Sequence, residues 1–131
     1  MPSKRVILAG LGHFFKSDPT PGSAFGTDFK VTQLQMLEDD MEKARAFGYD
    51  TSALDLDPDD IEGSMKRLQA ELKRQKCDVL LIGFGLRGNK DFTELFERAV
   101  NAGFEADPTI KFGFTRSPDD VLNTARRVLE V

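Results

Sequence analysis

Apolar runs alternate with helical stripes along the chain. Two runs, Val6–Ala9 and the apolar part of Asp78–Gly83, contain no polar interruption. Such runs are typical of strands that are buried on both faces of a parallel sheet. A weaker run, Thr51–Leu56, and a short run, Ile110–Phe114, predict further strands. The partial alternation of the run at 51–56 favours an edge position.

Apolar positions at helical spacing predict a helix after each strand. The first helix spans residues 31–47, and Gly48 follows as its stop. The second opens at 57–60, with Asp57 as its cap. The third spans about 91–102 and stops at Gly103, and the last starts at 117–120 in a pattern similar to a capping box. The stripes contain Leu34, Leu37, Met41 and Ala44; Ile61, Met65, Leu68 and Leu72; Phe92, Leu95, Phe96, Ala99 and Val100; and Val121, Leu122, Ala125, Val128 and Leu129.

The alternation of four strands with four helices predicts an α/β fold, because right-handed crossovers place helices on both faces of a parallel sheet. We expect a three-layer α-β-α sandwich with a four-stranded parallel sheet in the order 2-1-3-4. This Rossmann-like arrangement resembles the flavodoxin-like and receiver-like folds, with one strand fewer. Residues 1–131 are interpreted as one domain. A three-stranded sheet with 51–56 as coil is the alternative.

Composition narrows the class of protein. Of the 131 residues, 40% are hydrophobic and 31% charged, which suits a packed globular domain. The 18 basic and 22 acidic side chains give a net charge of −4, which disfavours nucleic acid and anionic membrane as partners. The sequence contains neither an apolar run of about 18 residues nor a signal-peptide pattern. A cytoplasmic location is therefore expected, and the single Cys77 agrees with it as a small buried residue rather than a nucleophile.

The fold class also predicts where a ligand site lies. In open α/β sheets, ligands bind beyond the carboxyl ends of the strands, at the point where the strand order reverses. In the order 2-1-3-4, that point lies between the first and third strands. The loops at 10–30 and 83–90 are therefore expected to form the site.

The first of these loops is unusually long and aromatic. About 20 residues separate the strand from the next helical stripe, where two to six are usual, and four of them are phenylalanines. Packing within the fold, a lid over a ligand and an interface with another chain are all open interpretations. His13 suits acid–base catalysis at neutral pH, although a surface or packing role accounts for it as well. Gly12, Phe14 and Lys16 are assigned to the ligand site with it.

The second loop has features of an anion site. Gly83 and Gly85 leave the backbone accessible, and Arg87, Gly88 and Asn89 precede a predicted helix start, where free amides and a guanidinium attract a carboxylate or phosphate. A solvated turn is the alternative. Thr115 and Arg116 border the same crevice after the last strand, unless Arg116 instead pairs with Asp119 or Asp120 at the surface.

Several established chemistries do not match the residues. The first loop lacks the third glycine of a dinucleotide fingerprint, and there is no Walker-type loop and no nucleophile elbow. An FMN site lacks a compact hydroxyl-rich loop and a Trp to stack on. A phospho-receiver lacks acidic residues at the ends of the first and third strands. Helix capping explains the acidic cluster of Asp55, Asp57, Asp59 and Asp60 better than a cation does. No cofactor and no protein-bound metal are therefore expected.

Two functional hypotheses follow. In the first, the protein binds a small anionic metabolite at the carboxyl ends of the first and third strands, and whether it also converts that metabolite is open. Arg87 and nearby amides hold the anion, and His13 acts as acid–base. In the second, the domain is a non-catalytic, receiver-like interaction module, for example a homodimer, as the total of 11 phenylalanines suggests.

Overall fold

A four-stranded parallel sheet forms the centre of the molecule. A computed structural model describes residues 3–15 and 27–130. The strands are β1 (Arg5–Gly10), β2 (Asp50–Asp55), β3 (Val79–Ile82) and β4 (Lys111–Phe114). Their order is β2-β1-β3-β4, which confirms the predicted order. The three-stranded alternative is wrong, because β2 pairs with β1 along all six of its residues.

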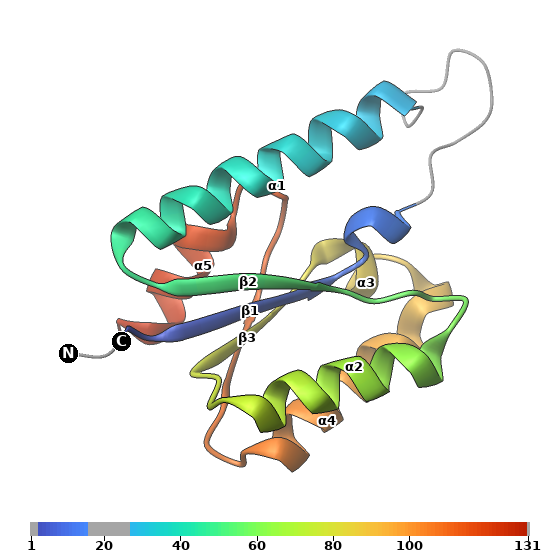
Figure 1. The fold of residues 1–131 in the computed structure, drawn as a ribbon. Coiled ribbons are helices and arrows are strands. Elements are labelled where there is room, and N and C mark those ends of the chain that lie inside the picture. The colour runs from blue at the N-terminus through green and yellow to red at the C-terminus, as the bar shows by residue number, and fades with distance from the viewer. Residues whose placement is uncertain (1–2, 16–26, 131) are drawn as a thin grey trace.

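Helices cover both faces of this sheet. The helical elements are η1 (Gly12–Phe14), α1 (Thr27–Phe47), α2 (Ile61–Arg74), α3 (Phe84–Arg87), η2 (Lys90–Phe92), α4 (Thr93–Ala106) and α5 (Val121–Leu129). One face packs against α1 and α5, and the opposite face packs against α2 and α4 (Figure 1). The protein is therefore a three-layer α/β sandwich of the flavodoxin-like type. Among the described residues, no helix has both the length and the apolar character that crossing a membrane requires.

The central strands supply side chains to both layers. Val6 and Leu8 of β1 belong to the cluster that packs under α1 and α5. Ile7 and Ala9 belong to the cluster under α2 and α4. Because side chains alternate across a strand, a run without polar residues is buried on both sides. This is why the two uninterrupted apolar runs became the central strands β1 and β3.

Two helix boundaries differ from the sequence prediction. α1 begins at Thr27 rather than at residue 31, so Phe29 and Lys30 belong to the helix. Part of the predicted loop is therefore helical, and residues 16–26, with the candidate Lys16, lie outside the described residues. α4 continues through Gly103 to Ala106. Gly103 is a packing residue here, since a Cβ at this position would lie 2.9 Å from the Phe112 ring.

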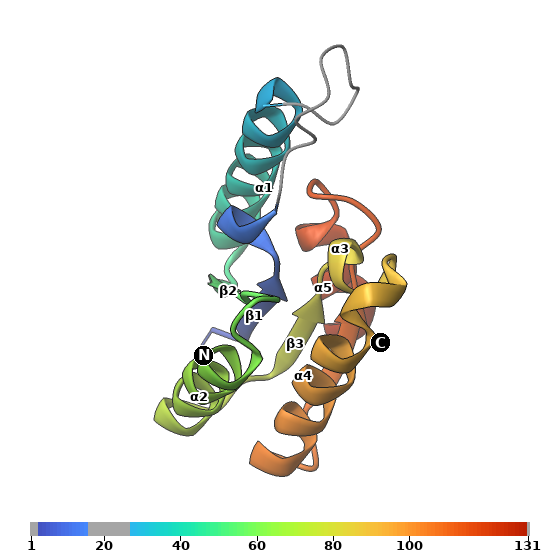
Figure 2. The same cartoon turned by 90° about the vertical axis from the view of Figure 1, so that its right-hand side faces the viewer.

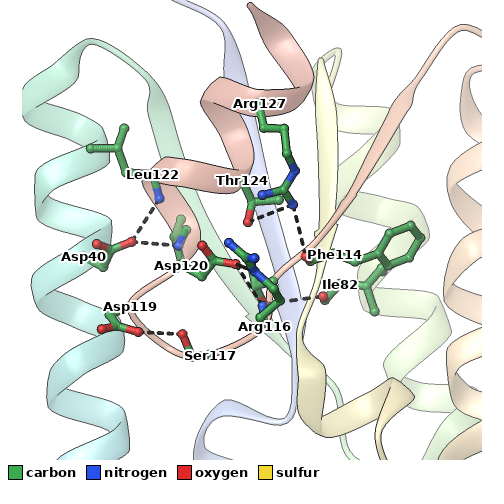
Figure 3. A network of polar contacts seen from close by, with 12 residues as sticks. Asp40, Ile82, Phe114, Arg116, Ser117, Asp119, Asp120, Leu122, Thr124 and Arg127 are labelled. Carbon is green, nitrogen blue, oxygen red and sulfur yellow. Dashed lines mark hydrogen bonds and ion pairs between the residues drawn. The ribbon is translucent and has the colours of Figure 1, made fainter.

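The capping residues also differ from the prediction. Asp60, not Asp57, caps α2 by accepting a hydrogen bond from the amide of Gly63 at 3.0 Å. The final helix begins at Val121, and no side chain of the preceding 117–120 segment caps it. Instead, Asp40 of α1 accepts hydrogen bonds from the amides of Val121 and Leu122 at 2.7 and 2.9 Å (Figure 3). α1 therefore supplies the cap of its neighbour α5.

A buried arginine closes the amino end of the sheet. The Arg5 side chain is 3% exposed, and its guanidinium bonds the Glu71 carboxylate. It also donates to the main-chain carbonyl of Gln75 at 2.7 Å. The amide of Arg5 donates to the carboxylate of Asp78, at the start of β3, at 2.7 Å. These bonds tie β1 to the last turn of α2 and to the segment before β3.

On each edge strand, an arginine donates to one outward-facing carbonyl group. The amides of Asp50 and Leu56 bond β1, so the carbonyl of Thr51 on β2 faces outward. This carbonyl accepts a hydrogen bond from Arg45 Nε at 3.0 Å. On the other edge, the carbonyl of Phe114 on β4 accepts one from Arg127 Nη2 at 3.4 Å. α1 and α5 thus each send a guanidinium to the sheet edge beside them.

Candidate functional site

A pocket of about 340 Å³ opens at the carboxyl ends of the strands. It lies at the predicted switch point, on the α1 and α5 side of the sheet. Figure 2 shows the N-terminal turns of α1 extending past the strand ends, on the side where η1 and α3 follow β1 and β3. The lining is mainly apolar and comes from the strand ends, η1, α1, α3 and the segment between β4 and α5. It comprises Leu8, Gly10, Leu11, Gly12, Phe15, Phe29, Gln33, Leu34, Leu37, Ala53, Asp55, Gly83, Phe84, Gly85, Thr115, Arg116, Ser117, Pro118 and Val121.

Two glycines form the floor of this pocket. Gly10 ends β1, and Gly83 follows β3 directly. A Cβ added at Gly83 would lie 3.5 Å from the Cα of Gly10. Because neither residue has a side chain, the ends of the two neighbouring central strands leave open space above their backbone. The sequence predicted this position from the same glycines.

The outer wall forms where α1 meets η1. The rings of Phe15 and Phe29 lie 5.9 Å apart between centroids. Lys30 Nζ donates to the carbonyl of His13 at 3.0 Å. Phe15 and Phe29 both line the pocket. Of the open interpretations of the aromatic loop, the described parts therefore act as pocket wall, and the crevice is not filled by them.

One polar group at the pocket is an aspartate that orients a histidine. Asp55 ends β2 and lines the pocket. Its Oδ2 lies 2.8 Å from His13 Nδ1 and accepts a hydrogen bond from the His13 amide at 3.2 Å. Gly12 makes this approach possible, since its φ is +50° and a Cβ there would lie 1.9 Å from Asp55 Oδ1. The His13 side chain is 80% exposed, so it stands at the rim of the pocket.

The other charged group of the lining is Arg116, after β4. Figure 3 shows its side chain beside Asp120, whose Oδ2 accepts hydrogen bonds from Arg116 Nε at 3.2 Å and from the Arg116 amide at 3.0 Å. Burial would raise the pKa of Asp120, but the hydrogen bonds from Arg116 and Thr124 outweigh it and lower the pKa. The predicted alternative of a pair with Asp120 is therefore correct, although this carboxylate is buried.

Arg87 does not take the predicted position. Its guanidinium stacks over the rings of Phe84 and Phe114, at 5.1 and 5.7 Å from their centroids. Its Nη2 donates to the carbonyl of Thr115 at 3.2 Å. Neither Arg87 nor His13 belongs to the lining of this pocket. The two aromatic rings hold Arg87 away from the glycine-lined floor.

The remaining predicted residues divide between two neighbouring hollows. Gly12, Gly85, Thr115 and Arg116 line the pocket described above. Phe14, Gly88 and Asn89 line a second hollow of about 350 Å³, which shares Leu11, Phe15, Phe84 and Gly85 with the first. There the Asn89 side chain accepts a hydrogen bond from the Asp91 amide at 2.9 Å, and the Gly88 amide bonds the Phe84 carbonyl. These groups are engaged in the turn between α3 and η2.

Asp55 is the functional candidate that sequence reasoning did not connect with His13. The two residues are 42 positions apart, and the sequence pattern places Asp55 in an acidic cluster. The signal that could have joined them is the parallel register, in which Asp55 pairs with Gly10, three residues before His13. In the described part of the chain, no three His, Cys, Asp or Glu side chains converge in a way that could hold a metal ion.

Comparison with known proteins adds no information about function. No protein-family model, curated protein or solved structure matches this chain. The functional argument therefore rests on the geometry of the pocket and its charged residues.

Proposed function

We propose that this protein binds a small, elongated anionic molecule with an apolar body in the pocket at the carboxyl ends of β1, β3 and β4. The observation that carries the proposal is the open apolar pocket of about 340 Å³ with Arg116 in its lining. Its volume falls in the usual range of small-molecule sites, which combine apolar walls with a few charged groups.

The walls favour an apolar ligand body. Leu34 and Leu37 of α1, Leu8 of β1, and the rings of Phe15 and Phe29 all belong to the apolar lining. Each methylene group transferred from water to such a surface contributes about 0.8 kcal/mol. A ring or short alkyl chain therefore supplies most of the binding free energy.

Arg116 favours an anionic group at one end of the ligand. Its side chain is 72% exposed, and Nε is the only guanidinium nitrogen that bonds a described residue. The two terminal nitrogens form the fork that suits a carboxylate. Asp120 holds the base of the guanidinium and so orients this fork.

A thermal-shift titration with two matched ligands tests the proposal. A phenylalkanoate is expected to raise the melting temperature more than the corresponding neutral amide. Ligand at 100 times its Kd adds about 2.7 kcal/mol of stability. Arg116→Met should abolish the preference for the carboxylate, and the matched control Arg126→Met, which also removes an arginine paired with an acid four residues later, should keep it.

A second pair of variants tests the location of the site. Leu34→Trp places a large ring in the pocket and should block binding. Val31→Trp makes the same change one helical turn earlier, at a 61% exposed position outside the lining, and should leave binding intact. Equal binding by wild type and Leu34→Trp would show that the ligand binds elsewhere.

A second candidate function, an interaction module, is favoured by phenylalanines beside β4. Phe104 stacks on Phe112 at 5.7 Å, and Phe96 lies 6.1 Å from Phe114. Phe84, Phe104 and Phe114 are 50%, 53% and 38% exposed. Exposed aromatics beside an arginine are typical of protein contacts. Sedimentation equilibrium tests for a homodimer: a dimer that Phe104→Ser weakens supports this candidate, and a monomer at high concentration argues against self-association.

A further inference from the structure

We infer that His13 and Asp55 form an acid–base pair that exchanges a proton with the end of the bound molecule farthest from Arg116. This inference rests on the proposed binding function and adds an acid–base role at the same site. The observation behind it is the contact between His13 Nδ1 and Asp55 Oδ2, at 2.8 Å, on the edge of the pocket.

The contact leaves one ring nitrogen available for chemistry. When Nδ1 donates to a carboxylate, the neutral imidazole presents the unprotonated Nε2 as a base. The carboxylate also stabilises the imidazolium that forms when Nε2 takes up a proton. The ring is exposed, so Nε2 can reach a group that projects from the pocket.

The backbone around His13 is held from two sides. Its amide donates to Asp55 at 3.2 Å, and its carbonyl accepts from Lys30 of α1 at 3.0 Å. Ordinary surface ion pairs join flexible side chains and contribute little. Here the main chain and the ring are both fixed, and the positive φ of Gly12 brings the turn against Asp55. Asp55 and Lys30 are the charged groups that contact His13 among the described residues.

The sheet sets the distance between the two polar ends of the site. Asp55 ends β2 and Arg116 follows β4, so they stand on opposite edges of the four strands. Three spacings of about 4.8 Å separate these edges, which gives roughly 14 Å between the strand ends. The substrate class is therefore an elongated acid with its carboxylate at Arg116 and an ionisable hydroxyl or related acidic group at His13.

The proposed step is a reversible proton transfer. The O–H bond of the substrate breaks, its electron pair stays on oxygen, and the proton joins His13 Nε2. An imidazolium and an oxyanion result, with Asp55 as the counter-ion of the imidazolium. No oxidant, reductant or further reactant is needed.

An alkanoate that carries a terminal nitrophenol serves as the probe, because nitrophenolate has its own visible absorbance. Binding is followed by thermal shift, and ionisation by absorbance, on the same full-length protein. Bound probe should show about a tenfold higher ratio of phenolate to phenol than free probe at neutral pH, the size expected for a nearby opposite charge. His13→Gln should remove this increase, and Asp55→Asn should reduce it, with each variant measured at a probe concentration that saturates it.

A second measurement guards against loss of structure in these variants. His13 is the only histidine of the chain, so its ring gives a single set of imidazole NMR signals. In wild type without ligand, the ring nitrogens should show protonated Nδ1 and unprotonated Nε2 at alkaline pH, and Asp55→Asn should shift the balance toward protonated Nε2. Variants that keep the melting temperature of wild type qualify for the comparison.

The outcomes separate the two proposals. Binding of the probe with no change in its ionisation, or with a change that His13→Gln retains, would overturn the acid–base pair and leave the binding function standing. If none of the carboxylates binds, both the binding function and the acid–base pair are overturned. The ordinary tautomer balance in wild type would show that His13 Nδ1 does not keep its hydrogen bond to Asp55 in solution, and would overturn the acid–base pair.

Discussion

The two ends of the sheet are built in opposite ways. At the amino end, the buried Arg5 satisfies the carbonyl of Gln75 and the carboxylate of Glu71. At the carboxyl end, Gly10 and Gly83 leave a pocket above the strands. Full hydrogen bonding at one end fixes the fold, and missing side chains at the other create room for a ligand. Changes at the amino end should therefore affect mainly stability, and changes at the carboxyl end mainly binding.

The largest effect is expected from Arg5→Met. This substitution removes the guanidinium but leaves the carbonyl of Gln75 and the carboxylate of Glu71 at the end of α2. Loss of the charged partner from such a buried network should lower the free energy of unfolding by about 3 kcal/mol. Urea denaturation measures it, with Lys4→Met as an exposed neighbouring control. Equal midpoints for both variants would contradict the contrast between the two ends.

The buried Cys77 lies at the same amino end of the sheet, and the pH dependence of stability tests its burial. Burial raises the pKa of this thiol from 9.0 to about 11. Above pH 9 the unfolded chain therefore releases a proton that the folded chain retains, so this contribution to stability falls as pH rises from about 9 to 11. Near pH 10.5 the loss should be about 2 kcal/mol. Denaturation of wild type and Cys77→Ala at pH 8 and 10.5 isolates this difference, and parallel curves would contradict burial of the thiol.

Gly12→Ala tests the carboxyl end. This substitution should lower the free energy of unfolding by about 1.5 kcal/mol. Alanine disfavours a φ of +50°, and its Cβ would meet the Asp55 carboxylate. Gly48→Ala is the matched control: its φ is +118°, but nothing lies within 4 Å of the added Cβ. Both variants should lose stability, whereas only Gly12→Ala should alter the NMR signals of His13. Identical His13 spectra in the two variants would show that Gly12 does not position the pair.

The smallest effect is expected from Asp40→Ala, which removes the cap of α5 while leaving the pocket lining in place. Loss of an N-terminal cap costs about 1 kcal/mol. Thermal denaturation measures this loss, with the exposed Asp39→Ala as control on the same helix. Val121 both lines the pocket and receives the cap, so ligand affinity should fall as well. This fall should be a smaller factor than the change in the equilibrium constant for unfolding. An unchanged melting temperature would mean that α5 does not depend on α1 for its start.

The fold could be predicted from the sequence because the strong signals agree with each other. The apolar runs that became β1 and β3 and the helical stripes between strands together define the order of the sheet. The start of α1 was missed because Thr27 and Asp28 precede the apolar stripe and contribute nothing to it. The cap from Asp40 could not be foreseen, since it joins helices 81 residues apart in the sequence.

The position of the pocket could be predicted from the sequence, whereas the arrangement of its polar residues could not. Gly10 and Gly83 indicated the floor of the pocket through a rule about strand ends, which depends on topology alone. The direction of Arg87 depends instead on two rings, Phe84 and Phe114, that only the tertiary structure brings to it. The partnership of His13 and Asp55 likewise needs the register of β2 against β1.

The arginines on the sheet edges have a consequence for how the protein behaves when crowded. A strand from another molecule that approached β2 or β4 would need to displace Arg45 from Thr51 or Arg127 from Phe114 before it could pair. Fibril growth and strand exchange begin with such an addition. These two arginines therefore oppose the addition of a further strand at Thr51 and at Phe114.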